Sequence, residues 1–283
     1  MIQDLDLNAY RPLVITVALT GAVPTKERYP RLPTSPTEIA ADAVACAEAG
    51  ASIVHIHMRD GAGEPSHSAE LFAETIGLIR QQSPELIICA TTTSRGSRTL
   101  SDRTAALQLD EALLPDLASL TLGSYNTPRG VNSNPPADIL EILAAMHATG
   151  VVPEIEIFEL GMVDTLNRLR KESLIPHTAP VNIFLGVEGA LNATAQNLVA
   201  AVTTLPDGAI WSGAGIGRFQ KTAIALAIAM GGGVRVGLED DPRGEHPDWT
   251  NVDSVQRACA LAESLGRTIA TPATTRQILG LDK

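Results

Sequence analysis

The chain of 283 residues has few cysteines, no long apolar run and no excess of basic side chains. Cys46, Cys89 and Cys259 have neither paired nor metal-type spacing, which argues against a disulfide framework and favours a reducing compartment. No stretch approaches the ~20 apolar residues that a membrane-spanning helix needs, and residues 1–6 carry no signal-like pattern. We therefore expect a cytoplasmic protein without a membrane partner.

The charge balance and composition limit the partners and the number of domains. A net charge of −11 at pH 7, with no basic run, argues against nucleic acid as a partner. A hydrophobic content of 45% is enough to bury a large core. Because no Gly/Ser/Pro-rich linker divides the chain, we expect one domain over residues 1–283.

A strand, loop, helix and glycine pattern repeats along the whole chain. Apolar and β-branched runs predict eight strands, at 13–19, 51–60, 86–91, 117–122, 152–158, 181–185, 209–212 and 233–237. A helix is expected after each strand, at 36–49, 69–82, 104–113, 134–150, 162–171, 190–203, 219–230 and 252–265. Eight such units predict a TIM (β/α)8 barrel. A doubly wound open sheet has the same alternation but gives no reason for eight units.

Side-chain alternation in the fifth predicted strand supports a closed barrel. Glu154 and Glu156 share one face of the segment 152–158, and Ile155 and Ile157 share the other. Two carboxylates on a strand that is covered on both sides point into a polar barrel mouth. Thr121 faces inward by the same alternation in the fourth strand and is a candidate for substrate binding.

Two histidines on the second predicted strand form half of a metal site. His55 and His57 lie on one face of the strand, and Val54 and Ile56 lie on the other. Closure of the barrel brings the end of the eighth strand, with Glu239, one strand away from them. Two histidines and one carboxylate leave a coordination position open, which is typical of catalytic zinc, and Mn²⁺ or Co²⁺ would accept the same ligands. The alternative is a pair of hydrogen-bonded core histidines.

An arginine and an aspartate accompany this group on the eighth strand. Arg235 has the parity of Glu239, so its guanidinium points into the barrel and requires carboxylate partners. Asp240, Glu154 and Glu156 are the candidates, and a purely structural ion pair is the alternative reading. Asp240 would remain ionised beside the arginine and could act as a base.

A glycine-rich segment follows the seventh predicted strand. Gly213, Gly215 and Gly217 read as a loop before a helix, which in barrels commonly binds phosphate through backbone N–H groups. Arg218 and Lys221 would add positive charge for a phosphorylated substrate or cofactor. The Gly-x-Gly-x-Gly pattern does not meet the dinucleotide fingerprint.

Other polar residues near strand ends are weaker candidates. Thr91 begins a run of hydroxyl residues suited to substrate binding or to simple loop formation. Cys89 faces inward, but no histidine is placed to activate it, so we expect a buried small residue. His67 and His246 follow strand ends and would lie at the edge of the barrel mouth.

Five segments together resemble the β-keto acid cleavage enzyme family, zinc TIM barrels that exchange acyl groups between a 3-keto acid and acetyl-CoA. The segments are 15–22 (ITVALTGA), 54–60 (VHIHMRD), 153–156 (PEIE), 211–218 (WSGAGIGR) and 234–240 (VRVGLED). The tail at 270–281 is also similar to the family. The run at 89–94 departs from the family pattern, which is richer in glycine there, and residues 23–26 lie where members differ by substrate.

The resemblance implies a role for each matching residue. His55, His57 and Glu239 become the zinc ligands, and Asp240, assisted by Arg235, becomes the base. It also implies an active-site carboxylate on the fifth strand, which we place at Glu154 with Glu156 as the alternative. A homo-oligomer, with a tetramer favoured, is a further expectation from the family.

The expected reaction condenses a 3-keto acid with acetyl-CoA and releases acetoacetate and a new acyl-CoA. Zinc would polarise the keto group, Asp240 would remove the proton from the intervening carbon, and the glycine-rich segment would hold the CoA. A metal-dependent hydrolase or lyase acting on a small carboxylate is the alternative, although a hydrolase would usually have further histidines at later strand ends. A non-catalytic metabolite-binding barrel would leave Arg235, Glu239 and Asp240 clustered without a purpose.

Overall fold

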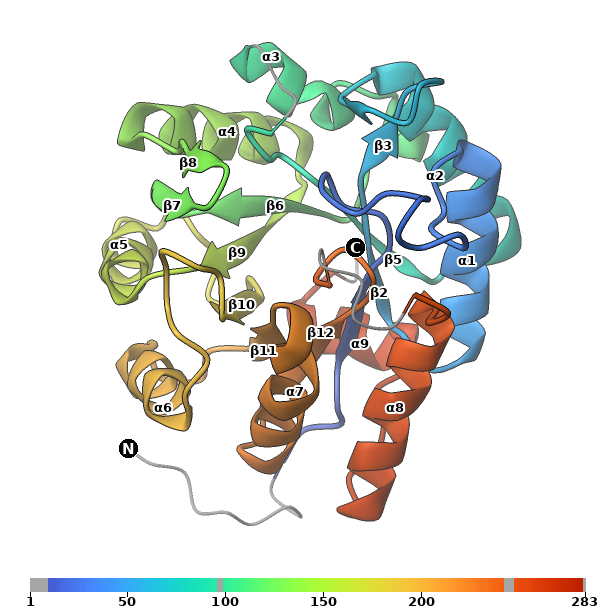
Figure 1. Ribbon diagram of the computed structural model, residues 1–283. Helices are drawn as coiled ribbons and strands as arrows, with labels where there is room; N and C mark the ends of the chain where they lie inside the picture. Colours follow the sequence, from blue (N-terminus) through green and yellow to red (C-terminus); the bar gives the residue numbers. More distant parts are fainter. Residues whose placement is uncertain (1–9, 96–98, 242–246, 282–283) are drawn as a thin grey trace.

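Eight parallel strands close into a barrel in the computed structural model, which describes residues 10–95, 99–241 and 247–281. Figure 1 looks onto the carboxyl ends of the strands. Around the barrel the order is β1 (Ile15–Ala18), β12 (Gly233–Val236), β11 (Trp211–Gly215), β10 (Val181–Leu185), β9 (Val152–Ile157), β6 (Leu117–Thr121), β5 (Ile87–Ala90) and β2 (Ile53–Ile56). Because β1 pairs with both β12 and β2, the predicted TIM barrel is confirmed.

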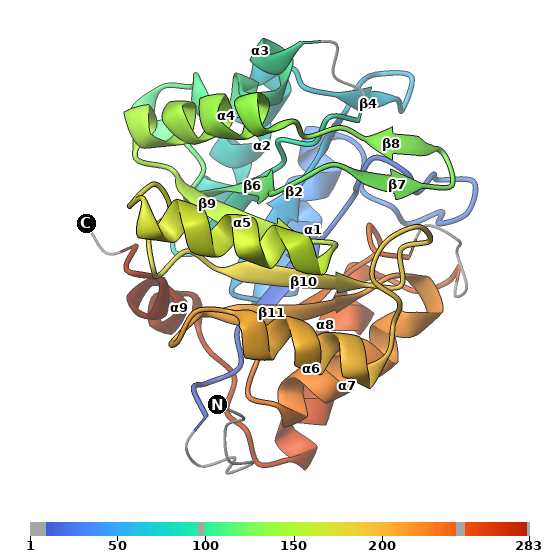
Figure 2. The ribbon, with the colours of Figure 1, turned by 90° about the vertical axis from the view of Figure 1, so that its left-hand side faces the viewer.

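Helices surround the barrel as the sequence pattern predicted (Figures 1 and 2). The long ones are α1 (Pro36–Glu48), α2 (Ala69–Gln82), α4 (Pro136–Thr149), α5 (Leu160–Lys171), α6 (Ala195–Thr204), α7 (Gln220–Ala229) and α8 (Asn251–Ser264). Ser35 and Glu38 form the expected capping box at the start of α1. Gly150 ends α4 with a φ of 73°, a left-handed conformation that favours glycine.

The predicted helix at 104–113 is wrong. In its place are α3 (Leu100–Arg103) and two 3-10 turns, η2 (Ala105–Leu107) and η3 (Glu111–Leu113). Thr99 and Asp102 form a capping box that starts α3 upstream of the predicted helix. The predicted start of the sixth helix, at residue 190, is also too early, because Thr194 caps α6 by accepting a hydrogen bond from the amide of Asn197.

The histidine strand is shorter than the predicted segment 51–60. It ends at Ile56, and the chain then forms an antiparallel pair of β3 (Met58–Arg59) with β4 (Pro65–Ser66). Arg59 is buried there and donates hydrogen bonds to the carbonyl oxygens of Gly21 and Pro24, at 2.6 and 3.0 Å. This contact fixes the segment after β1 against the end of the histidine strand.

Two apolar layers determine which side chains reach the barrel mouth. The outward residues of the strands, such as Ile15 and Ile155, pack under the helices in one large cluster. A smaller cluster inside the barrel joins Ile53, Ile87 and Leu117 to Leu279 of the C-terminal helix α9 (Pro272–Leu279). The amino end of the barrel interior is therefore apolar, and polar inward side chains lie closer to the carboxyl end.

A hairpin and the charge distribution complete the outline of the fold. β7 (Tyr125–Thr127) pairs with β8 (Gly130–Asn132), and this hairpin extends beyond the carboxyl end of the barrel in Figure 2.

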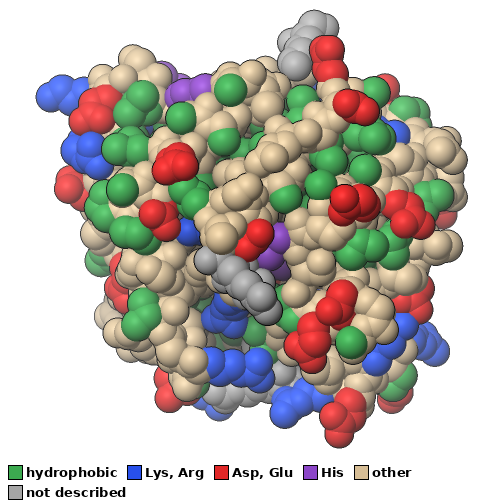
Figure 3. All heavy atoms as spheres, turned by 90° about the horizontal axis from the view of Figure 1, so that it is seen from above, with side chains coloured by type: hydrophobic (Ala, Val, Ile, Leu, Met, Phe, Trp, Pro, Cys, Tyr) green, Lys and Arg blue, Asp and Glu red, His purple; other side chains and the backbone are tan. Residues whose placement is uncertain are grey.

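Acidic and basic side chains are interspersed on the face shown in Figure 3. Within the described residues, no helix combines the length and apolar character required to cross a membrane.

Candidate active site

His55, His57 and Glu239 meet at the carboxyl end of the barrel. The carboxylate of Glu239 lies 3.8 Å from His55 Nε2 through Oε2 and 3.2 Å from His57 Nε2 through Oε1. One ligand-type atom from each residue lies within 4.8 Å of the other two. His55 is on β2, His57 is the first residue after β2, and Glu239 follows β12.

Glycines make room for this arrangement. Gly21 has a φ of +64°, and a Cβ there would lie 2.5 Å from Cγ of Glu239. Gly237, with a φ of +130°, turns the chain after β12 against the backbone of Ala18, whose carbonyl oxygen accepts a hydrogen bond of 3.2 Å from the amide of Glu239. Both glycines occupy conformations that other residues rarely adopt, so the position of Glu239 is fixed by the backbone.

The donor set fits a divalent metal such as zinc. Glu239 Oε2 is buried and has no hydrogen-bond partner among the described residues. Burying an unpaired carboxylate oxygen is costly, and a cation at this point would remove the cost. Two imidazole nitrogens and one carboxylate, opening onto a cavity, match a catalytic rather than a closed structural site.

Arg235 forms a dense ion-pair network directly beside this group. Its Nε lies 3.0 Å from Asp240 Oδ2, and its Nη2 lies 2.9 Å from Glu239 Oε1 and 3.3 Å from Asp240 Oδ1. Its Nη1 lies 3.9 Å from both Glu154 and Glu156. The arginine is 1% exposed, and its predicted carboxylate partners are all present.

Burial sets the protonation of the nearby groups. It raises the pKa of Asp240 to about 6, against the opposing effect of Arg235. It raises the pKa of Glu156 to about 7, again opposed by Arg235. Burial also raises the pKa of Glu239, but His57, Arg235 and His55 outweigh it and hold that pKa well below its usual value. Burial keeps the pKa of His55 well below normal, which leaves a neutral imidazole suited to metal binding.

Glu154 and Cys89 lie beneath the site. The Cys89 thiol donates to Glu154 Oε2 at 3.2 Å, and His55 Nδ1 lies 3.4 Å from the sulfur and 3.7 Å from Glu154 Oε2. These contacts orient the ring of His55 from the side opposite Glu239. Cys89 is fully buried, as predicted, and burial raises the pKa of its thiol well above normal, which makes it a poor nucleophile.

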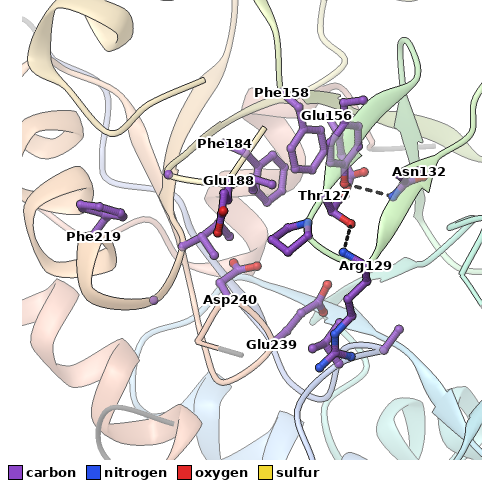
Figure 4. A pocket seen from close by; sticks show the side chains of 18 of the residues that line it. Thr127, Arg129, Asn132, Glu156, Phe158, Phe184, Glu188, Phe219, Glu239 and Asp240 are labelled. Atoms are coloured by element: carbon purple, nitrogen blue, oxygen red, sulfur yellow. Dashed lines mark hydrogen bonds between the residues drawn. The ribbon is translucent and has the colours of Figure 1, made fainter. Parts of the chain in front are cut away.

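His55, His57 and Glu239 are called the metal-type group below. A cavity of about 830 Å³ opens above this group (Figure 4). His57, Glu239, Asp240, Arg235 and Glu156 all line it. We expected Glu154 to be the strand-five carboxylate that faces the substrate, with Glu156 as the alternative. Of the two, Glu156 is on the cavity wall and Glu154 is in the layer below.

The predicted threonines divide between two roles. Thr91 lines the cavity, and its hydroxyl accepts a hydrogen bond of 3.1 Å from the amide of Thr93. Thr121 donates a hydrogen bond of 2.6 Å to Glu156 Oε2 and is not among the described residues that line the cavity. Thr121 therefore orients Glu156, and the expectation that it contacts substrate directly is not supported by its position.

The glycine-rich segment requires a correction. Gly213 and Gly215 lie within β11, not in a loop, and neither is among the described residues that line the cavity. A Cβ at Gly213 would lie 2.7 Å from that of Ala227, and one at Gly215 would overlap the backbone of Phe219. These glycines let α7 and the turn before it pack closely on the strand. Gly217 and Arg218 do line the cavity, so only this half of the segment can meet a ligand.

Three stacked aromatic rings form one wall of the cavity, and the sequence pattern did not predict them. Tyr125, Phe158 and Phe184 line the cavity and stack in parallel, with ring centroids 4.0 and 4.4 Å apart. The Arg235 guanidinium lies 4.9 Å from the centroid of the Phe184 ring. Alternation in β10 could have identified Phe184, which is two residues from the inward-facing Asn182, but the hairpin that carries Tyr125 gave no such signal.

His67 and His246 were the two histidines predicted to lie at the edge of the barrel mouth. His67 Nε2 lies 3.1 Å from the carbonyl oxygen of Arg95, so this histidine supports the loop after β5 instead of reaching the cavity. His246 lies outside the described residues.

The fold and the site together define a TIM-barrel enzyme with a metal-type ligand group beside an arginine-held carboxylate. A model of the beta-keto acid cleavage enzyme family matches residues 12–281. The chain therefore belongs to this family, which confirms the resemblance drawn from its sequence and the class of enzyme predicted from it.

Individual relatives agree with this membership. A 3-keto-5-aminohexanoate cleavage enzyme from Fusobacterium nucleatum subsp. nucleatum is 38% identical, covering 96% of this chain and 98% of its own. A 3-oxoadipate:acetyl-CoA acetyltransferase from Cupriavidus necator is 37% identical, covering 96% of this chain and 95% of its own. A solved binary complex of ObcA with oxaloacetate aligns with a TM-score of 0.75 at 20% identity, covering 89% of this chain and 67% of that one, and supports the fold alone.

Proposed function

We propose that the protein transfers an acyl group from a 3-keto acid to CoA at the expense of acetyl-CoA, releasing acetoacetate. Family membership and the acetyl-CoA-dependent activity in the name of the Cupriavidus relative support the reaction class. The observation that carries the proposal is the convergence of His55, His57 and Glu239 next to the Arg235–Asp240 pair. All of these residues except the buried His55 line the cavity.

His55, His57 and Glu239 would hold the metal, with zinc as the first candidate and Mn²⁺ or Co²⁺ as alternatives. A bound divalent ion supplies Lewis acidity, which lowers the cost of negative charge on a keto group and acidifies the neighbouring carbon. The unpaired Oε2 of Glu239 and the neutral His55 support this assignment.

Asp240 would remove the proton from the carbon between the keto and carboxylate groups. It lines the cavity, and Arg235 holds both of its oxygens in place. A base with a pKa of about 6 is mostly ionised at neutral pH and still accepts a proton effectively. The resulting carbanion attacks the acetyl-CoA thioester, and the released CoA thiolate attacks the original ketone. Cleavage of the bond between that ketone carbon and the former carbanion carbon gives the new acyl-CoA. Return of the proton from Asp240 to the former carbanion carbon then gives acetoacetate.

Glu156 and Glu154 would serve different purposes. Glu156 faces the cavity and is partly protonated near neutral pH, so it can exchange a proton with groups on the reacting carbons. Glu154 would be a positioning residue, because its contacts are with His55, Cys89 and Arg235 in the layer below the cavity.

The CoA would enter past the end of β11. Gly217 and Arg218 line the main cavity and also a small neighbouring cavity of about 60 Å³ that Lys221, Trp249 and Arg257 help to form. Three cations on this side of the mouth would attract the phosphates of CoA in an otherwise acidic protein. This keeps the predicted CoA region but moves it away from Gly213 and Gly215.

The assembly and compartment are further parts of the proposal. Family membership favours a homo-oligomer, with a tetramer as the expected form, which light scattering on the eluting protein tests directly. Three free cysteines favour a reducing compartment such as the cytoplasm.

The test is a panel of 3-keto acids incubated with acetyl-CoA and the metal-loaded protein, with acetoacetate and acyl-CoA followed by mass spectrometry. Both products should form together and in equal amounts. Release of free acetate or of an unesterified acid from the keto acid, without a requirement for acetyl-CoA, would favour a metal-dependent hydrolase instead. In the described part of the chain no third histidine joins the metal-type group, which argues against that alternative.

A further inference from the structure

Two groups of cations lie on different sides of the cavity mouth. Arg218 stands after β11, on the side assigned above to CoA. Arg95 and Arg129 line the same cavity from the loop after β5 and from the turn between β7 and β8. In Figure 4, Arg129 lies with Thr127 and Asn132, whereas Phe219, next to Arg218, lies across the cavity. The proposed reaction gives the Arg95 and Arg129 side no role.

The two segments that carry these arginines are bound to each other. Ser94, adjacent to Arg95, donates a hydrogen bond of 2.8 Å to Asn132 Oδ1. Asn132 pairs across the hairpin with Tyr125 and donates to its hydroxyl at 3.0 Å. Arg129 occupies the turn of the same hairpin, where its amide donates to Thr127 Oγ1 at 3.3 Å. The arginines therefore belong to one connected part of the wall.

These guanidinium groups have no anionic partner of their own. Over the described residues, neither Arg95 nor Arg129 forms an ion pair with a carboxylate. Glu188, another acidic residue on the cavity wall, lies on the Asp240 side in Figure 4, away from Arg129. In a protein with a net charge of −11, two arginines without carboxylate partners on the wall of a reaction cavity form a local anion site.

We propose that Arg95 and Arg129 bind a second carboxylate at the far end of the substrate, so that the preferred substrate is a 3-keto dicarboxylic acid. The inference rests on the proposed function, because the reacting end of the acid is placed at Asp240 and the metal-type group. Guanidinium groups bind carboxylates through paired, charge-assisted hydrogen bonds, which discriminate strongly against an uncharged tail. The stacked rings of Tyr125 and Phe158 would contact the methylene groups between the two ends.

Arg95 and Arg129 could instead bind a phosphate of CoA. The following experiment distinguishes a substrate carboxylate from a CoA phosphate. The probes are 3-oxoadipate and 3-oxohexanoate, which have the same carbon chain but end in a carboxylate and a methyl group. We expect kcat/KM for 3-oxoadipate to exceed that for 3-oxohexanoate by about 10- to 100-fold, the size of one or two hydrogen bonds to a charged group.

Arg95→Gln and Arg129→Gln should each reduce kcat/KM for 3-oxoadipate by about 10-fold or more, with 3-oxohexanoate and the KM for acetyl-CoA unchanged. Arg31→Gln is the matched control, because Arg31 is exposed in the segment after β1 and is not among the described residues that line the cavity. It should leave both substrates unaffected.

Three outcomes would overturn the inference. Equal or faster turnover of 3-oxohexanoate would show that no far-end carboxylate is required, while leaving the proposed function intact. A raised KM for acetyl-CoA in the two variants, without a change in selectivity between the acids, would assign the arginines to CoA. Absence of acetoacetate from the whole panel of 3-keto acids would overturn the proposed function as well.

Discussion

Arg235 holds both carboxylate oxygens of Asp240, through Nε at 3.0 Å and Nη2 at 3.3 Å. The same Nη2 also donates to Glu239 Oε1 at 2.9 Å. One buried guanidinium therefore links the proposed base to a proposed metal ligand, and it fixes the distance between them. This arrangement holds the two carboxylates of the turn after β12 in defined positions.

Asp240→Asn tests the role of the base. The asparagine is nearly isosteric, but it cannot accept the substrate proton and it loses the charge that pairs with Arg235, so kcat should fall by about 10²- to 10⁴-fold. Metal content should remain that of the wild type, because Asp240 is not in the ligand group. Metal analysis and steady-state kinetics on the same preparation measure both quantities. Retention of more than a tenth of the wild-type kcat would rule out Asp240 as the base.

Gly21→Ala should weaken metal binding without unfolding the barrel. The added Cβ would meet Glu239 Cγ at 2.5 Å and must displace the carboxylate. Displacing a ligand or its support typically costs about 10- to 100-fold in metal affinity, which competition with a chromogenic chelator can measure.

Gly63→Ala is the control for this substitution. Gly63 also has a positive φ, +83°, but a Cβ there would meet nothing within 4 Å. Both variants therefore suffer the same kind of backbone strain, and only Gly21→Ala should lose metal affinity. Equal affinity in the two variants would contradict the placement of Glu239 in the metal site.

Asp42→Asn should change how stability depends on pH. Burial raises the pKa of Asp42 from 3.8 to about 6, although Asn251 donates a hydrogen bond to it. The folded state therefore binds this proton more tightly than the unfolded state, and its contribution to stability is lost as the pH rises from about 4 through 6. The asparagine variant lacks this loss.

Urea unfolding at pH 5 and pH 8 measures the effect. Relative to the wild type, Asp42→Asn should gain about 1.4 kcal/mol of stability between these two pH values, because about one pH unit separates pH 5 from the folded-state pKa of about 6. Asp164→Asn on the exposed face of α5 is the control and should show no such gain. A parallel pH response in all three proteins would mean that Asp42 is ionised in the folded state at no cost.

Much of the site could be predicted because strand alternation and barrel closure are local and topological rules. The i, i+2 spacing of His55 and His57 determined their shared face, and pairing of β1 with both β2 and β12 brought Glu239 to them. Arg235 was correctly expected to require carboxylate partners, because an unpaired buried guanidinium is costly.

Features that depend on tertiary packing were not predictable. Gly213 and Gly215 resemble an anion loop in sequence, but their lack of side chains serves the close approach of α7. Alternation gave Glu154 and Glu156 the same face, and only their depth in the barrel separates them. The aromatic wall combines Tyr125 of a hairpin with Phe158 and Phe184, and no local pattern joins these elements.

In the proposed reaction the acetyl group of acetyl-CoA becomes part of acetoacetate. The most direct measurement incubates the metal-loaded protein with unlabelled 3-keto acid and acetyl-CoA that carries ¹³C at both acetyl carbons, and then determines product masses. We expect acetoacetate that is heavier by two mass units, together with an unlabelled new acyl-CoA. Unlabelled acetoacetate, or cleavage of the keto acid that proceeds equally well without acetyl-CoA, would contradict the proposed reaction.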